Sequence, residues 1–308
     1  MLNSVKQAIV DDYVRQVGRH DSHDIFGAPA GDPGLTGPGS MSWELHSDVA
    51  AIAIGGVGAI IMEILHPSVM AGVQDLSSYR ENPYRRSRTT YGYVVTTTFG
   101  STEAATRLIN AVKRIHEKVN GRRPDGIPYR ALDPELIGWV HTCIPWAVMT
   151  AFERFNRPLS DEEKARYLAE QAVIGRMGGA GEIPETAAEL EQYVEAMRPK
   201  LAVTGQTREF FGFLLASPFG VRLPGPLARS GNRFYLEAGM GLMPRWAQEL
   251  TGFAPSPAGY RTLHEPALRA YARALRWGFG TPPFRALADR RVEAEAASAD
   301  ENEALAAA

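Results

Sequence analysis

Apolar residues recur at helical spacing along most of the chain, and this pattern predicts a protein built almost entirely of helices. The segment 101–120 carries one apolar stripe on a polar background, made of Leu108, Ile109, Val112, Ile115 and Val119. The segment 47–65 is apolar nearly throughout, which indicates a buried core helix that ends before Pro67. Further helices are predicted at 4–17, 187–201, 207–216, 229–250, 266–277 and 284–297.

Capping residues mark where two more helices begin. Asp133-Pro134-Glu135 combines an N-cap residue, a proline at the first helical position and an acid in the first turn, which predicts a helix running to about Phe155. Ser160 and Glu163 have the S-x-x-E spacing of a capping box. Gly121 is expected at the C-terminal end of the helix 101–120.

Two segments depart from the helical pattern. The β-branched and aromatic residues of 91–99 favour a strand by propensity, but a single strand would have no partner, so we expect a helix there. The segment 26–40 is dense in Gly and Pro and predicts a loop. The fold class is therefore all-α. We expect an N-terminal helix and Gly/Pro-rich loop at 1–36, one globular multi-helix domain at 37–290, and a polar tail at 291–308.

Composition excludes several functional classes. Lys and Arg total 33 against 35 for Asp and Glu in 308 residues, a balance that gives no reason to expect nucleic-acid binding. With the single cysteine Cys143, neither an intramolecular disulfide nor a cysteine-based metal site can form. The longest uncharged run, 49–62, is shorter than the roughly 20 residues of a transmembrane helix. The N-terminus has no signal-peptide pattern, so we expect a cytoplasmic protein.

The sequence lacks the common nucleotide-binding and hydrolytic motifs. Gly55-Gly56-Val57-Gly58 lacks the spacing of a nucleotide-binding loop, and we expect these glycines to permit close helix packing. The sequence contains no G-x-S-x-G elbow, no phosphate-binding G-x-x-x-x-G-K-[ST] loop and no H-E-x-x-H zinc helix.

Three of the seven histidines have a context that favours chemistry: His66, His116 and His141. Glu63 and His66 form an E-x-x-H pair, of which a di-iron bundle needs two, and a second one is not found. His66 is alternatively a residue that caps or packs at the helix end next to Pro67. A non-haem metal enzyme using Glu63, His66 and His116 stays open.

His141 lies in the middle of an apolar helix. Gly138 removes a side chain one turn earlier and would leave room for a flat group, and Pro145 removes a backbone donor and favours a kink. These residues leave two interpretations open. His141 is either a hydrogen-bonded core histidine, which is the commoner case, or the ligand of a metal or a haem.

Three arginines gather in the segment Arg85-Arg86-Ser87-Arg88-Thr89. Guanidinium groups pair well with carboxylates, so this segment fits an internal anionic cofactor. It equally fits a solvated helix face that carries salt bridges.

Five fragments, in this order, resemble the MpaB / rubber oxygenase (latex-clearing protein) catalytic domain family over about residues 37–250. They are GPGSMSWELHSD (37–48), AIIMEILHPSVMAGVQDLS (59–77), ENPYRRSRTTYGYVVTTTFG (81–100), IHEKVNGRRPDGIPYRALDPELIGWVH (115–141) and LSDEEKARYLAE (159–170). The resemblance implies an all-helical domain enclosing haem b. It also implies oxygenase chemistry, which in the best-known members cleaves carbon–carbon double bonds of isoprenoids. The proximal iron ligand of the family falls on His141.

The rubber-cleaving branch has an Arg-x-x-Lys-Thr pattern on the distal side of the haem. Arg85 and Thr89 match it, whereas Arg88 replaces the lysine, and a guanidinium has no lone pair for iron. The resemblance thus implies that Arg85, Arg88, Thr89 and His66 line the distal, catalytic side or anchor propionates.

The same resemblance gives His116 a supporting role at the haem and leaves the iron position opposite His141 for dioxygen. The implied function is a haem-b-dependent oxygenase acting on an apolar small molecule, such as an isoprenoid or another alkene. A haem protein without turnover, such as a sensor or carrier, is the alternative on the same scaffold.

Overall fold

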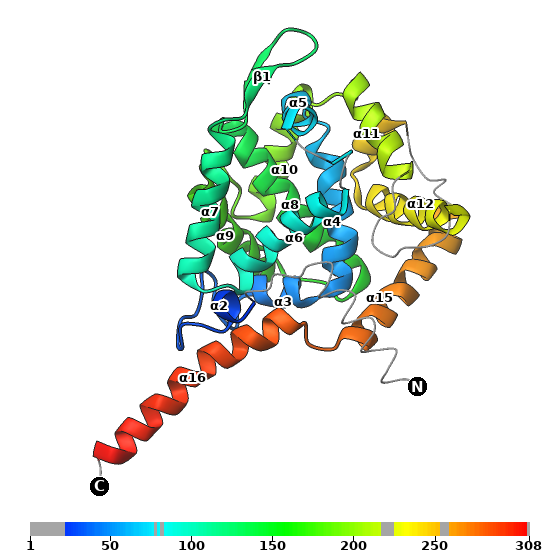
Figure 1. The fold of residues 1–308 in the computed structure, drawn as a ribbon. Helices are drawn as coiled ribbons and strands as arrows, with labels where there is room; N and C mark the ends of the chain where they lie inside the picture. Colours follow the sequence, from blue (N-terminus) through cyan, green and yellow to red (C-terminus); the bar gives the residue numbers. More distant parts are fainter. Residues whose placement is uncertain (1–21, 77–78, 81–82, 217–224, 253–258, 307–308) are drawn as a thin grey trace.

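The computed structural model describes residues 22–76, 79–80, 83–216, 225–252 and 259–306 (Figure 1). Over these ranges the chain is all-α apart from one short hairpin, as predicted. The elements are α2 (Ser22–Phe26), α3 (Met41–Ser47), α4 (Val49–Glu63), α5 (Pro67–Leu76), α6 (Pro83–Phe99), α7 (Thr102–His116), β1 (Asn120–Arg122), β2 (Pro128–Arg130), α8 (Pro134–Phe155), α9 (Asp161–Gly178), α10 (Ala187–Met197), the 3-10 helix η1 (Arg198–Lys200), α11 (Gly205–Ala216), α12 (Gly225–Leu242), α13 (Arg245–Thr251), the π-helix η2 (Tyr260–His264), α15 (Glu265–Phe279) and α16 (Pro283–Ala306).

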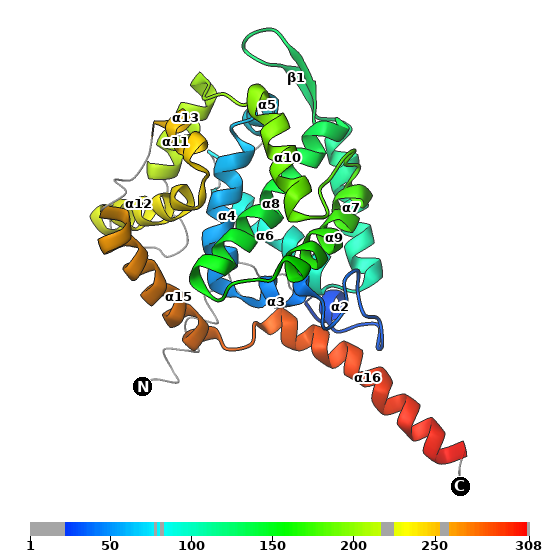
Figure 2. The same ribbon diagram turned by 180° about the vertical axis from the view of Figure 1, so that it is seen from behind.

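Helix α4 is the centre of the core, and it packs against α8, α12 and α15 (Figures 1 and 2). Two of its glycines allow this close packing. A Cβ atom on Gly55 would lie 2.8 Å from the Cα of Val148 in α8, and one on Gly58 would lie 3.0 Å from a methyl carbon of Leu242. The predicted use of these glycines in helix packing is therefore confirmed.

Asp48 fixes the beginning of α4 to two distant helices. One carboxylate oxygen accepts the backbone N–H groups of the first turn of α4. The other accepts Arg276 Nη2 of α15 at 2.7 Å and Asn156 Nδ2, just after α8, at 2.8 Å. One buried carboxylate thus satisfies a helix N-terminus and joins three elements of the core.

Both predicted helix starts are confirmed. The Asp133 side chain accepts the Glu135 N–H, and α8 runs from Pro134 as one helix. Ser160 and Glu163 make both bonds of the capping box before α9. The segment 91–99 lies within α6, so tertiary packing overrides its strand propensity, as expected.

Two predicted boundaries are wrong. Helix α7 ends at His116, and Gly121 lies in strand β1, where it pairs with Tyr129 of β2. A Cβ on Gly121 would lie 2.9 Å from the Tyr129 hydroxyl, so the glycine serves the hairpin and not a helix end. The segment 229–250 is two helices, α12 and α13, because Pro244 cannot continue the first.

Other predictions differ in extent. The short helices α3 and α5 were not predicted from the sequence. The last helix, α16, continues to Ala306 and projects away from the body of the molecule (Figure 1). The predicted helix at 4–17 lies outside the described residues.

Arg291 anchors α16 to the domain. Its side chain is 1% exposed although it stands at the predicted start of the polar tail. It donates to the backbone carbonyl groups of Phe26, Asp32 and Phe99 at 2.7–2.9 Å. The C-terminal helix, the segment after α2 and the end of α6 are therefore held together by one guanidinium.

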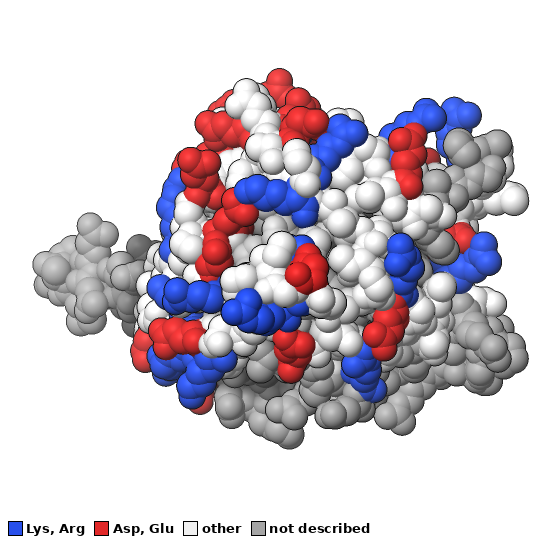
Figure 3. All heavy atoms as spheres, turned by 90° about the horizontal axis from the view of Figure 1, so that it is seen from above, with Lys and Arg blue, Asp and Glu red and all other residues white. Residues whose placement is uncertain are grey.

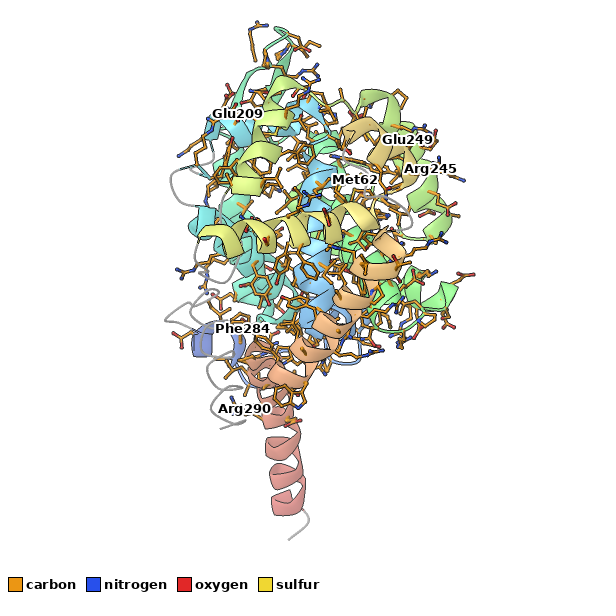
Figure 4. The ribbon with its side chains drawn as sticks, turned by 90° about the vertical axis from the view of Figure 1, so that its right-hand side faces the viewer. Met62, Glu209, Arg245, Glu249, Phe284 and Arg290 are labelled. Carbon is orange, nitrogen blue, oxygen red and sulfur yellow. The ribbon has the colours of Figure 1, made fainter. Side chains whose placement is uncertain are left out.

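The interior and the surface differ as expected for a globular chain. In Figure 4, Met62 of α4 lies inside, 1% exposed, whereas Arg245 and Glu249 of α13 lie at the outer surface. Figure 3 shows both signs of charge interspersed on the face seen from above. Over the residues coloured there, no continuous basic area of the kind that binds nucleic acid is visible.

The length and hydropathy of the helices in the described ranges bear on whether one could span a membrane. No single helix there is both long and apolar enough to cross a bilayer. The pair α3 and α4 meets the criterion jointly, but the chain bends by 91° between them.

Candidate functional site around His141

His141 lies on α8 with its ring against a glycine wall on α9. A Cβ atom on Gly175 would come 3.2 Å from the His141 Cβ, and one on Gly178 would come 3.0 Å from Nε2. A side chain at Gly178 would push the ring aside, whereas one at Gly175 would first meet the Cδ1 of Ile183. The two glycines therefore form a cradle for the imidazole, three residues apart on one helix face.

Tyr93 of α6 contacts the same imidazole. The ring centroids are 5.9 Å apart and the planes are inclined at 66°, an edge-to-face arrangement. Burial raises the pKa of the Tyr93 phenol, so it stays protonated. Side chains and backbone from α6, α8 and α9 thus meet at His141.

The His141 imidazole is neutral at pH 7. Burial lowers its pKa to about 4, and the positive charge of a protonated His116 lowers it further. Within the described ranges, neither ring nitrogen of His141 takes part in a hydrogen bond. A neutral imidazole with a free lone pair is the form that binds iron and other transition metals.

His116 ends α7 and lies close enough to His141 for their charges to interact. Helix α7 packs beside α9 (Figure 2), and the Lys113 side chain passes 4.0 Å from the Cβ position of Gly179. The structure therefore brings two of the three candidate histidines to one region.

His66 lies elsewhere, at the junction of α4 and α5. It is 5% exposed, and its Nδ1 accepts the Ser68 N–H at 3.2 Å, which caps α5. Burial lowers its pKa to about 4, with smaller effects from charges that include Glu135 and Arg123. Neither a hydrogen bond nor a ring contact joins His66 to His141. The capping role of His66 is confirmed, and its role at a haem stays a prediction.

The described residues do not form the alternative non-haem metal site. Among them, no group of three or more His, Cys, Asp or Glu side chains is placed to share a metal ion. Glu63, His66 and His116 are therefore not gathered into a ligand set.

The arginine segment lies at the beginning of α6. Arg88 and Thr89 are exposed, and Thr89 stands one helical turn before Tyr93 on the same face. Arg85 is in the same helix, with its side chain outside the described residues. Tyr93 thus links this segment to His141 along one face of α6.

Gly138 does not leave the gap expected from the sequence. The space that a side chain at Gly138 would take is occupied by the Glu182 carbonyl oxygen and the Tyr193 hydroxyl, which lie 2.9 and 3.0 Å from the Cβ position. The space one turn from His141 is therefore filled by α10 and the loop before it. Helix α8 also runs as one element through Pro145.

His46 is a core histidine. It is 4% exposed, and its two ring nitrogens bond Thr98 Oγ1 at 2.6 Å and the Tyr167 hydroxyl at 2.8 Å. Burial lowers its pKa to about 3. Unlike His141, it has both nitrogens engaged and none free for a ligand.

Three residues at the site were missed from the sequence: Tyr93, Gly175 and Gly178. The glycines had a signal, because the sequence Ile-Gly-Arg-Met-Gly-Gly at 174–179 puts small residues three apart near a helix end. Tyr93 had only its spacing of four residues from Thr89.

The fold and the site define an all-helical domain that presents one neutral, mostly buried imidazole beside a glycine wall. The family described as "ER-bound oxygenase mpaB/B'/Rubber oxygenase, catalytic domain" matches residues 43–277. The match covers well over half of the chain, and the protein belongs to this family. At the level of class, it is an oxygenase.

Individual relatives add little about function. The chain is 26% identical over 193 residues to an uncharacterised protein of Mycobacterium bovis, and equally to one of Mycobacterium tuberculosis. In each case the alignment covers 60% of this chain and 73% of the relative. The comparison with solved structures gives no match.

Proposed function

We propose that the protein is a haem-b-dependent oxygenase that holds iron through His141 and acts on an apolar, alkene-containing small molecule. The observation that carries the proposal is the neutral His141 imidazole with no hydrogen bond at either nitrogen, in a chain of an oxygenase family. The partly buried imidazole keeps a lone pair for iron, because within the described residues neither ring nitrogen is engaged in a hydrogen bond.

The chemistry of the surrounding residues fits a haem. A single imidazole is the protein ligand that many haem oxygen-binding and oxygen-activating proteins use. The cradle at Gly175 and Gly178 is space that a Cβ would fill. Arg85 and Arg88, on the helix that reaches His141 through Tyr93, supply guanidinium groups of the kind that pair with propionates.

When bound, haem supplies a redox-active iron centre for dioxygen chemistry. The chain holds that group through His141, while Gly178 and Tyr93 orient the imidazole. Arg88 offers donors only, since guanidinium stays protonated at all relevant pH values. Thr89 offers a hydroxyl that donates and accepts. Buried apolar side chains on α4 and α8 exclude water from the interior behind the site.

Arg88 also bears on the substrate. The lysine expected in the rubber-cleaving branch is replaced, so the iron ligation that a lysine amine provides is removed. We therefore favour a small apolar substrate over a polymer. His116 supports the site through its charge near His141, and His66 supports the distal side of the haem from the junction that it caps.

The test is the absorption spectrum of the purified chain loaded with haemin. We expect a Soret band that His141→Ala abolishes or shifts, and that His264→Ala, a matched change on η2, leaves unchanged. His116→Ala is run in parallel, and it should change the band less than His141→Ala. A wild-type protein that stays colourless with excess haemin would overturn the proposal.

Turnover needs a separate measurement. We expect the loaded protein to consume oxygen and yield a carbonyl product from an isoprenoid alkene. A stable Soret band without oxygen consumption over a panel of alkenes would favour a sensor or carrier. Iron content without a Soret band would favour a non-haem enzyme.

A further inference from the structure

Tyr93 is a residue of the site that neither the sequence motifs nor the family description assigns. We propose that Tyr93 is a positioning residue: its ring fixes the plane of the His141 imidazole against the glycine wall of α9. The proposal rests on the proposed role of His141 as the haem ligand. It concerns the aromatic ring of Tyr93 and not its hydroxyl.

The residues around His141 restrict the rotation of its ring. The torsion that rotates an imidazole about its Cβ–Cγ bond is broad, so backbone conformation alone does not set the ring plane. Gly175 and Gly178 lie beside the ring on α9: a Cβ on Gly178 would come 3.0 Å from Nε2, and one on Gly175 would come 3.5 Å from Cγ. Tyr93 meets it from α6 at 5.9 Å and 66°. Contacts from two helices thus restrict a rotation that is otherwise free.

Tyr93 lies outside the large apolar clusters of the core. Tyr91, two residues earlier and on the other side of α6, packs against both large apolar clusters of the described chain. Tyr93 belongs to neither cluster and is partly exposed. A large aromatic side chain outside the core, in contact with a free imidazole, is best explained by that contact.

Tyr93 belongs to a regular part of α6, and its backbone carbonyl accepts a side-chain hydrogen bond. The Thr97 hydroxyl donates to the Tyr93 carbonyl at 2.9 Å, one turn later in α6. Burial keeps the phenol protonated, so the ring puts no negative charge beside the imidazole. Thr89 stands on the same face of α6 as Tyr93, one turn earlier.

The experiment compares Tyr93→Phe, Tyr93→Leu and Tyr91→Leu in the full haemin-loaded chain. The readouts are haemin affinity and the electron paramagnetic resonance spectrum, which reports the orientation of an axial imidazole. We expect Tyr93→Leu to weaken haemin binding at least five-fold and to broaden or shift the spectrum. Tyr93→Phe should restore both, since it keeps the ring.

The matched control, Tyr91→Leu, should lower the melting temperature without changing the spectrum. A Tyr93→Leu protein with the wild-type spectrum and affinity would overturn the inference. So would a Tyr93→Phe protein as impaired as Tyr93→Leu, because the hydroxyl would then be the active part. Circular dichroism verifies that each variant is folded. If the wild-type chain takes up no haemin, the proposed function itself fails; if it binds haemin through His141 but ignores Tyr93→Leu, only this inference fails.

Discussion

Replacing Gly178 by alanine places one methyl group against the Nε2 end of the His141 imidazole. The new Cβ would lie 3.0 Å from His141 Nε2 and 3.6 Å from the two neighbouring ring carbons, and these three atoms are its nearest contacts. Ordinary van der Waals contact begins at 3.4 Å, so the imidazole must move by a few tenths of an ångström. The perturbation therefore acts first on His141.

The free-energy cost of Gly178→Ala differs between the haem-free and the haem-loaded protein. Without haem, the partly exposed His141 ring can turn away, and alanine in place of a helical glycine stabilises by up to about 1 kcal/mol. With haem, the iron bond holds the ring where the methyl group must fit. Overpacking of this kind costs about 1–3 kcal/mol. This corresponds to roughly 5- to 150-fold weaker haemin binding with little change in stability.

The assay is a haemin titration followed at the Soret band, alongside thermal unfolding of the haem-free proteins. Gly212→Ala on α11 is the matched control, because a Cβ there meets nothing within 4 Å. It should bind haemin as the wild type does. Gly178→Ala protein that is folded and binds haemin within two-fold of the wild type would refute the role of the glycine wall.

Three further predictions concern buried polar groups that hold the fold. Burial lowers the pKa of His46 to about 3 in the folded protein, against the usual 6.5. The His46 contribution to the unfolding free energy is therefore complete above pH 6.5. It falls as the pH drops toward 3, by up to about 1.4 kcal/mol per pH unit, because the unfolded chain binds the proton more readily. His46→Gln should flatten the pH dependence of urea unfolding over this range; an unchanged slope would contradict the assignment. Asp48→Ala should lower the free energy of unfolding by about 3 kcal/mol, because it leaves Arg276 without its carboxylate and the first turn of α4 uncapped. Asp289→Ala, at a more exposed pair, should lower it by less than about 1 kcal/mol. Equal losses of unfolding free energy in chemical denaturation would argue against this role of Asp48. Arg291→Met should remove three charge-assisted bonds to backbone carbonyl groups, which together contribute more than about 3 kcal/mol to the free energy of unfolding. We expect faster hydrogen exchange in α16 and in the segment after α2. Unchanged protection there would show that α16 is held by other contacts.

Local signals in the sequence predicted the helix starts well. Asp133 with Pro134, and Ser160 with Glu163, satisfy the free N–H groups of the next turn, and each bond spans three residues or fewer. Signals at helix ends were less reliable. Gly121 suits a helix C-terminus by type, but pairing with Tyr129 across the hairpin decided its conformation.

The site was predicted only in part. His141 and the arginine segment stood out because they lie in ordered motifs that resemble a known family. Gly138 was misinterpreted, because the Glu182 carbonyl and the Tyr193 hydroxyl fill its space from a later part of the chain. The bond from Ser68 shows that His66 caps α5, which the sequence left open, and its role at a haem stays a prediction.

The sequence by itself determined the helical class, the family and the candidate ligand, since these depend on periodicity, caps and ordered motifs that are local in the chain. Only the tertiary structure decided what surrounds His141. Tyr93, His116, Gly175 and Gly178 come from three different helices, and their approach depends on how α6, α7 and α9 pack around α8. Burial in that packing also makes the imidazole neutral, because desolvation disfavours its charged form.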